Sequence, residues 1–432
     1  MKIKPIIGIM PVLMAGIETR HSDSRGMVPH PEPEKTGIIT AETFRLDNQS
    51  ELAKAKIDLW YKNYNQGKSY LRLGCSDARP VFDEELVWSQ RSVSCGFPHK
   101  DIYADAYTGS KVIATVVDTH YGKFENGKRP EGCGGQDTSA KIKSGVIEVT
   151  EGITGYVSEN VHEDPIVQGI LQAKEVVTHL KNSGKEGRVF VTTQDHRSGL
   201  IVPVAEYVVA NGKLVSSITA LGFGTFFDAE TEEEIERAYM PSILYATGIP
   251  SLTENSVSGE FKKYLEIAKN KVDRVKAEHS DFSETQAVQN PWALVISANK
   301  IPVQNRYPTL FGNLGSAFQV DIPRTKNERE GVVIPPEAIE TAICQMQYAM
   351  EHAVEHHGIP NTDFSDSKTL FIETGSLSQS RRVAHQLFAK DENGLFVKDW
   401  AGAWLALGGK VFLAETHAGT TSRTEEYVPI AA

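Results

Sequence analysis

The hydrophobic pattern of the chain contains three short apolar runs that are typical of buried strands. They lie at 70–74, 111–117 and 188–192, and polar or glycine-containing sequence bounds each of them. A helical pattern at about 166–180 separates the second run from the third. Because strands that alternate with helices favour a sheet with parallel strands, we predict an α/β fold.

Two further stretches have the spacing of apolar and polar residues expected of helices. The first is 41–65, and the second is the highly charged stretch 231–285. The apolar face of the first stretch consists of Leu52, Ile57, Leu59 and Trp60. The polar residues 281–290 are the candidate linker between two halves of the chain.

The second half of the chain repeats the first in weak form. The matched segments, which occur in the same order in both halves, are 71–75 with 294–298, 115–120 with 370–375, and 187–191 with 409–413. The second copy has Ala298 in place of Cys75, and Gly375 in place of His120. We therefore expect an internally duplicated fold with an active half and a silent half.

This repeat divides the chain into three predicted parts. An amino-terminal arm and helix cover 1–68, a catalytic domain covers 69–285, and a degenerate repeat domain without metal ligands covers 286–432. At the amino terminus, Pro5 and Pro11 interrupt the apolar stretch and no clear cleavage site follows. A buried segment is therefore favoured there over a secretory signal.

The composition and charge of the chain disfavour nucleic-acid-binding and membrane-spanning proteins. Of the 432 residues, 40% are hydrophobic and 23% are charged, which is typical of a globular protein. The net charge of −11 and the lack of a long basic run disfavour nucleic acid as a partner. No apolar run approaches the ~18 residues that a membrane span needs. Four cysteines in so long a chain favour thiols or metal ligands in a reducing compartment, so we expect a cytoplasmic protein.

The strongest chemical signal is a set of candidate zinc ligands: Cys75, His120 and Cys133. Two thiolates and one imidazole suit tetrahedral Zn2+, and three protein ligands leave a fourth position open, as in catalytic sites. Cys75 and His120 follow predicted strands, and Cys133 lies in a glycine-rich loop. In open α/β sheets, sites form at the carboxyl ends of strands.

Asp77 and Arg79 are the candidate catalytic residues of this site. Arg79 can hold the Asp77 carboxylate by a two-pronged hydrogen bond. An ionised Asp77 can then accept the hydrogen of a zinc-bound hydroxide, which zinc generates near neutral pH. Backbone donors from Gly134 and Gly135 are expected to line a narrow substrate pocket.

These motifs resemble the β-class carbonic anhydrases, whose signature is Cys-x-Asp-x-Arg followed by His and then Cys-Gly. Twelve residues separate His120 from Cys133, where the family usually has two. The longer gap and the degenerate second half are most similar to the divergent carboxysome-shell branch, and diatom cadmium-or-zinc enzymes also stretch this gap. The motifs cover about residues 70–210, and the repeat extends the resemblance to 432.

The resemblance implies a β-carbonic-anhydrase-like sheet flanked by helices. It also implies reversible hydration of carbon dioxide to bicarbonate by a zinc-bound hydroxide. Active sites of this class lie near a dimer interface, so a fused silent half would reproduce that pairing within one chain. A homo-oligomer is also expected. Because we see no shell- or Rubisco-binding repeats, association with a carboxysome shell or Rubisco stays open.

Other interpretations of the sequence remain. Carbon disulfide or carbonyl sulfide hydrolases use the same ligand set, and a non-catalytic zinc scaffold or shell protein is a further alternative. Cys95 and His99 have ligand spacing, but no Asp–Arg pair accompanies them. Residues 352–356 match H-x-x-E-H without a convincing third ligand, and Cys344 fits a helix core. Asp195 and His196 are either structural or part of the pocket.

Overall fold

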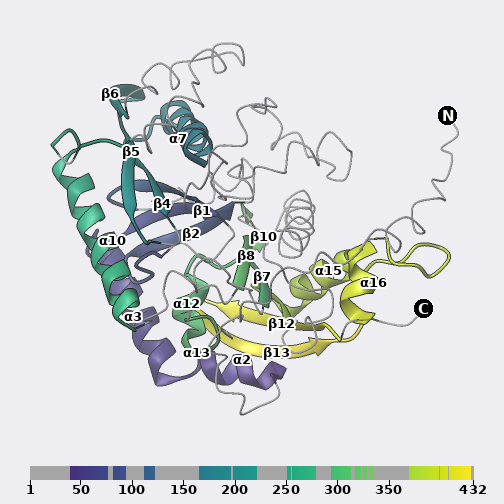
Figure 1. The fold of residues 1–432 in the computed structure, drawn as a ribbon. Coiled ribbons are helices and arrows are strands. Elements are labelled where there is room, and N and C mark those ends of the chain that lie inside the picture. Colours follow the sequence, from purple (N-terminus) through teal and green to yellow (C-terminus); the bar gives the residue numbers. More distant parts are fainter. Residues whose placement is uncertain are drawn as a thin grey trace, which may run out of the picture. The chain divides into compact units, whose positions relative to one another are not determined.

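The computed structural model describes a mixed α/β fold with two mixed sheets flanked by helices (Figure 1). The described residues all lie within one compact unit, Gly37–Ala432. They are 39–75, 81–93, 111–121, 165–195, 198–220, 251–253, 255–278, 293–312, 317–322, 325–327, 331–333, 369–397, 399–406 and 408–429. Among them, no helix is long and apolar enough to cross a bilayer.

The first sheet has six strands in the order β2-β1-β3-β4-β5-β6. Their bounds are β1 Tyr70–Cys75, β2 Val87–Val93, β3 Thr115–Tyr121, β4 Gly187–Asp195, β5 Ile201–Ala210 and β6 Lys213–Thr219. Strands β1 to β4 are parallel to one another, whereas β5 is antiparallel to β4 and β6 is antiparallel to β5. The carboxyl ends of β1, β3 and β4 therefore meet at one edge of the sheet.

The second sheet has five strands in the order β13-β12-β11-β7-β8. Their bounds are β7 Ala293–Ser297, β8 Ala317–Asp321, β11 Thr369–Thr374, β12 Lys410–His417 and β13 Thr420–Tyr427, and β9 Thr325–Asn327 pairs with β10 Gly331–Val333 in a separate ribbon. Starting from β8, this order and these strand directions repeat those of the first five strands of the other sheet.

The pairing register of the two sheets also agrees with the sequence matches. Leu71 lies opposite Thr115 in the first sheet. In the second sheet, the matched residues Leu294 and Leu370 lie opposite each other. The matched positions therefore occupy equivalent places in the two sheets.

Helices cover both faces of each sheet. Their bounds are α2 Ala41–Asn48, α3 Glu51–Asn65, α7 Pro165–Asn182, α10 Gly259–Glu278, α12 Val303–Arg306, α13 Pro308–Phe311, α15 Leu377–Leu387 and α16 Asp399–Ala406. In the first sheet, α10 packs on the face that carries Val116 and Phe190. Helix α7 lies on the opposite face, where a Cβ added at Gly169 would come within 3.2 Å of Thr119 and 3.1 Å of Val191.

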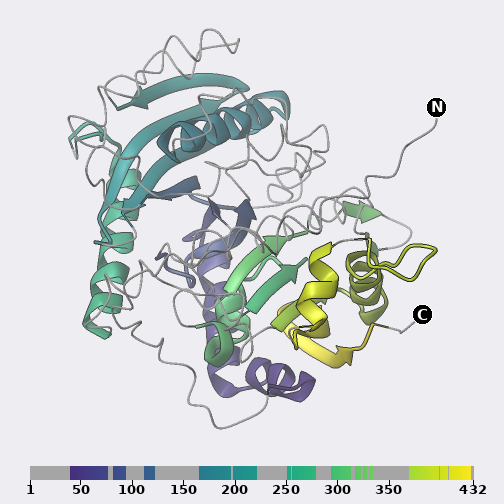
Figure 2. The same ribbon diagram turned by 45° about the vertical axis from the view of Figure 1, so that its right-hand side comes forward.

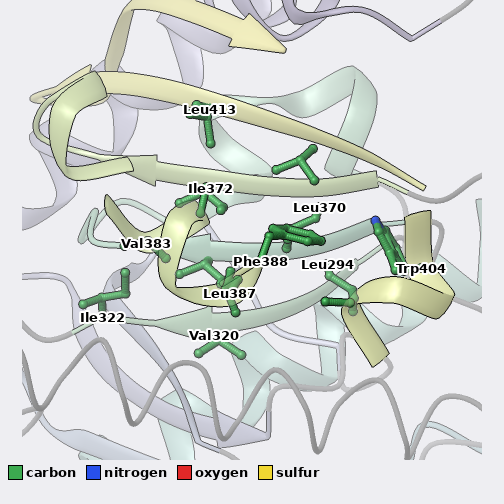
Figure 3. Packing of buried hydrophobic residues seen from close by; sticks show 14 of the residues in the cluster. Leu294, Val320, Ile322, Leu370, Ile372, Val383, Leu387, Phe388, Trp404 and Leu413 are labelled. Atoms are coloured by element: carbon green, nitrogen blue, oxygen red, sulfur yellow. The ribbon is translucent and has the colours of Figure 1, made fainter. Parts of the chain in front are cut away.

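The second sheet has an equally apolar interior. Helices α15 and α16 pack Val383, Leu387 and Trp404 against one face of the sheet. Figure 3 shows these side chains gathered with Leu370, Ile372 and other sheet residues. Helix α2 covers the opposite face, where the ring of Phe44 stacks on Phe371 with centroids 4.3 Å apart.

Each sheet is covered by a helix that precedes the other sheet's first strand. Helix α2 comes before β1 but packs on β13, and Figures 1 and 2 both show it beside the second sheet. Helix α10 comes before β7 but packs on the first sheet, where Phe261 stacks on Phe190 with centroids 4.4 Å apart. The helices are thus exchanged between the halves.

Helix α2 also hydrogen-bonds the outer edge of the second sheet. Thr421 of β13 donates its backbone N–H to Asn48 at 2.7 Å, and the Gln49 side chain donates to the Thr421 carbonyl at 3.2 Å. The Asn48 side chain donates to the Gly419 carbonyl at 2.9 Å.

Two details of the sequence prediction were wrong. The run at 111–117 becomes a strand only from Thr115, because partners on β1 and β4 begin there and those on β4 continue to Tyr121. The stretch 41–65 forms two helices, because Ser50 caps the second by accepting the Ala53 backbone N–H. In that second helix Leu52 faces solvent, with 54% exposure.

Candidate active site

Two of the predicted zinc ligands come from adjacent strands. Cys75 is the last residue of β1, and His120 lies one residue before the end of β3. The two strands are paired in parallel, with Gly74 opposite Asp118, so both ligand positions reach the same edge. His120 is completely buried. Both positions thus lie near the carboxyl ends of neighbouring strands.

Several predicted residues lie outside the part of the chain that the structure describes. They are Asp77, Arg79, Cys95, His99, Cys133, Gly134, Gly135, His196, Cys344 and residues 352–356, together with the side chain of Cys75. Among the described residues, no three His, Cys, Asp or Glu side chains gather as a metal site. The predicted ligand set therefore remains a prediction.

A buried ion pair lies directly behind these positions. Arg72, three residues before Cys75, donates from Nη2 to Asp118 Oδ2 at 2.8 Å and from Nε at 3.2 Å. Thr192 of β4 donates to the other carboxylate oxygen of Asp118 at 2.9 Å. Arg72 is 1% exposed and Asp118 5% exposed. This cluster ties the ends of β1, β3 and β4 together.

The guanidinium of Arg72 occupies space that a glycine leaves open. A Cβ at Gly74 would lie 2.6 Å from the guanidinium carbon, which no real Cβ contact allows. On another side the guanidinium lies 4.3 Å from the ring centroid of Phe82. The ion pair between Arg72 and Asp118 therefore depends on a glycine at position 74. The sequence feature that could have pointed to this pair is a charged residue, Arg72, inside an apolar strand.

Val81, the first described residue after Asp77 and Arg79 in the sequence, is held by a buried side chain of β4. The backbone N–H of Val81 donates to Gln194 Oε1 at 2.7 Å. Gln194 lies on β4, directly opposite His120 in the pairing register, and is 1% exposed. This contact links Val81 to β4, the strand next to that of His120, and the sequence pattern gave no signal for it.

A second charged cluster connects this region to the covering helices. Glu84 pairs with Lys56 of α3 at 3.0 Å and with Lys271 of α10 at 2.9 Å. Burial opposes ionisation of Glu84, but the two lysines outweigh it and hold the pKa of the carboxyl below its ordinary value of 4.5. Close by on α10, burial and then the charge of Asp118 raise the pKa of Tyr264.

The second sheet has different residues at the equivalent edge. Ala298 follows β7 and Gly375 follows β11, so the proposed cysteine and histidine ligands have no counterparts there. Glu373, at the position that matches Asp118, forms a completely buried ion pair with Arg306 of α12. Ser297 donates to the same carboxylate at 3.2 Å and Tyr307 at 3.3 Å. Burial, followed by the charge of Glu373, raises the pKa of Tyr307.

The remaining candidates take ordinary positions. Asp195 ends β4 and accepts a hydrogen bond from the Ser198 hydroxyl at 2.8 Å, so it shapes the turn into β5. His417, which matches it in the second sheet, has a side chain that is 65% exposed. Comparison with protein-family models and with curated proteins finds no match for this chain.

Proposed function

We propose that this protein is a zinc-dependent carbonic anhydrase of the β superfamily, which hydrates carbon dioxide reversibly to bicarbonate and a proton. The observation that supports the proposal is that Cys75 and His120 lie near the carboxyl ends of paired parallel strands. In the second sheet, Ala298 and Gly375 occupy the matching places. The proposed ligands are Cys75, His120 and Cys133.

We further propose that the two halves arose by duplication and form a fused pair. The shared strand order, the shared register and the exchanged helices support this proposal. Strands β2 and β8 also contact each other. The resemblance to β-class enzymes places active sites near a dimer interface, and a silent second half would supply that interface within one chain.

The chain's own residues have distinct proposed roles. When bound, zinc would lower the pKa of a water ligand to about 7 and so make a nucleophile available near neutral pH. Asp77, held by Arg79, would orient that nucleophile by accepting its hydrogen. Gly134 and Gly135 would offer backbone donors to the substrate oxygens. Arg72 and Asp118 hold the two ligand strands together behind the site.

The metal proposal is tested by removing single ligands. Cys75→Ser, His120→Ala and Cys133→Ser should each lower the zinc content far below one per chain, because a broken tetrahedral set binds zinc much more weakly. Cys344→Ser and His417→Ala are matched controls and should keep the parent zinc content. Emission spectroscopy measures the metal. Near-stoichiometric zinc in the His120→Ala protein would mean that this ligand is misassigned.

The catalytic proposal is tested on zinc-verified protein. Asp77→Asn and Arg79→Ala should keep zinc but lose rate, because removing one positioned group costs ~10²–10⁴-fold in general acid–base work. Stopped-flow hydration of carbon dioxide measures this rate. Turnover of Asp77→Asn within about twofold of the parent, far below that expected loss, would refute the mechanism. Faster turnover of carbonyl sulfide or carbon disulfide would reassign the substrate.

A further inference from the structure

Gln194 offers a buried hydrogen-bond donor beside the proposed zinc site. It lies on β4 opposite His120 in the register, so the two side chains project from the same face of the sheet. The residue is 1% exposed. Within the described residues, its amide nitrogen Nε2 has no hydrogen-bond partner. Buried polar atoms in proteins nearly always have one, so this atom calls for an explanation.

The orientation of the amide is fixed by its contact with the backbone. The N–H of Val81 can only donate, so the atom that it meets at 2.7 Å must be the amide oxygen of Gln194. Nε2 is therefore the free end of the group, and it carries two N–H donors. The amide thus joins Val81 to β4, next to His120 in the pairing register.

The carboxylate oxygens of Asp118, on the neighbouring strand, already accept hydrogen bonds from other residues. Both carboxylate oxygens of Asp118 receive hydrogen bonds, from Arg72 on one side and from Thr192 on the other. In the silent half the place of Gln194 is taken by Thr416, whose hydroxyl bonds to Thr421 at 3.0 Å. A donor without a partner thus occurs at this position in the half that carries the proposed ligands, whereas its counterpart is bonded.

We propose that Nε2 of Gln194 donates a hydrogen bond to an oxygen of bicarbonate, the anion that the proposed function produces and consumes. The inference rests on that function for the identity of the anion. A neutral amide suits this task, because it stabilises the oxygen of the anion without trapping it as a cation would. Gln194 is thus a substrate-binding residue, and its oxygen separately accepts the Val81 backbone N–H.

Two substitutions separate the donor from the anchor. Gln194→Met removes both groups at similar volume and adds no charge. Gln194→Glu keeps an oxygen for Val81 but removes the donor, and it introduces a charge that repels anions. Gln172→Met is the matched control, because Gln172 is a buried glutamine of α7, on the opposite face of the sheet. Zinc content and thermal midpoint are measured on every protein.

The decisive measurement is the affinity for ¹³C-labelled bicarbonate, followed by NMR titration. A donor role predicts that both Gln194 variants bind bicarbonate about ten- to a hundredfold more weakly, the range for a hydrogen bond to a charged group. The Gln172→Met protein should bind it as the parent does. If only Gln194→Met loses bicarbonate affinity, Gln194 acts only by holding Val81. If only Gln194→Glu loses it, the loss comes from repulsion between the new carboxylate and bicarbonate. Either result overturns the proposal.

The result also separates this inference from the proposed function. If the parent hydrates carbon dioxide but the Gln194 variants keep its bicarbonate affinity, the inference fails and the function stands. If the parent binds bicarbonate through Gln194 but does not hydrate carbon dioxide, the function fails and the inference stands. A parent that does not bind bicarbonate overturns the inference. Should Gln194→Met not fold, Gln194→Asn replaces it, because the shorter side chain withdraws the donor by one methylene.

Discussion

Arg72 illustrates how one residue can decide the architecture behind a site. Its guanidinium and the Asp118 carboxylate are both withdrawn from water, so each depends on the other to offset its desolvation. The same carboxylate position in the second sheet is Glu373, but its arginine comes from α12 instead of the first strand. Both sheets thus have a buried carboxylate paired with an arginine, although the arginine comes from a strand in the first sheet and from a helix in the second.

Removing Arg72 should therefore destabilise the protein strongly. Arg72→Met leaves Asp118 buried without its cation, and breaking a buried pair in this way costs about 3–5 kcal/mol. Urea denaturation measures the loss in free energy of unfolding. The control is Arg381→Met, which breaks the exposed pair with Glu425 and should cost no more than about 1 kcal/mol. Equal losses of unfolding free energy in the two variants would show that the buried pair stabilises the protein no more than the exposed pair does.

At this scale the sequence singled out candidate ligands but not the buried contacts near them. Cys75 and His120 stand out because their residue types have a specific chemistry. Arg72 lies in an apolar run, where the pattern predicts a buried strand and gives no partner for the charge. Asp118 is 46 positions further along the chain, so only the strand pairing brings the two together. The contact between Gln194 and Val81 is equally long-range.

At the scale of elements, the exchanged helices are the main structural feature. Phe261 of α10 is completely buried against Phe190 and belongs to the core of the first sheet. Phe261→Ala should lower the free energy of unfolding by about 3–5 kcal/mol, the usual cost of truncating a buried phenylalanine. Leu52→Ala, on the exposed side of α3, should change it by less than about 0.5 kcal/mol. Thermal or urea unfolding checks both values.

The cluster around Glu84 predicts a defined pH dependence. Its pKa is depressed in the folded protein, so its stabilising contribution is complete above the ordinary value of 4.5 and is lost as the pH falls through the lower folded value. The parent should therefore exceed Glu84→Gln in stability above pH 4.5, and this difference should shrink below it. Unfolding curves at a series of pH values measure the difference.

A matched control tests whether the effect belongs to the buried cluster. Glu51→Gln removes a carboxylate that is 91% exposed and pairs with Lys54 on the same helix. Solvent screens such pairs, so this variant should follow the parent at every pH. A stability difference for Glu84→Gln that does not change with pH would contradict the assignment.

The elements themselves were largely predictable, whereas their partners were not. Short apolar runs located β1 and β4, which are buried on both faces, and helical periodicity located α7 and much of α3 and α10. No local signal shows that α2 covers the second sheet and α10 the first. Both helices are amphipathic, and an amphipathic face fits any apolar surface. Contacts in the folded chain, such as the stacking of Phe44 and of Phe261, show which sheet each helix covers.

For the molecule as a whole, the exchange predicts how the chain responds to being cut. Residues 1–285 retain α10 on the first sheet, but α2 and its Phe44 lose the sheet that they cover. This fragment should aggregate or form a new dimer, because an apolar face is left open. Co-expression with residues 286–432 should restore a soluble 1:1 complex. Gel filtration distinguishes these outcomes, and a monomeric, fully active 1–285 fragment would refute the fused-pair proposal.

The side chains at the end of α2 have one more consequence. Asn48 and Gln49 occupy the outward N–H and carbonyl of Thr421, which a strand from another molecule would otherwise bind. An open sheet edge is a template for edge-to-edge growth, and proteins that leave one uncovered tend to assemble into fibres. By filling these positions from within the same chain, α2 makes this end of the second sheet a poor seed for such growth.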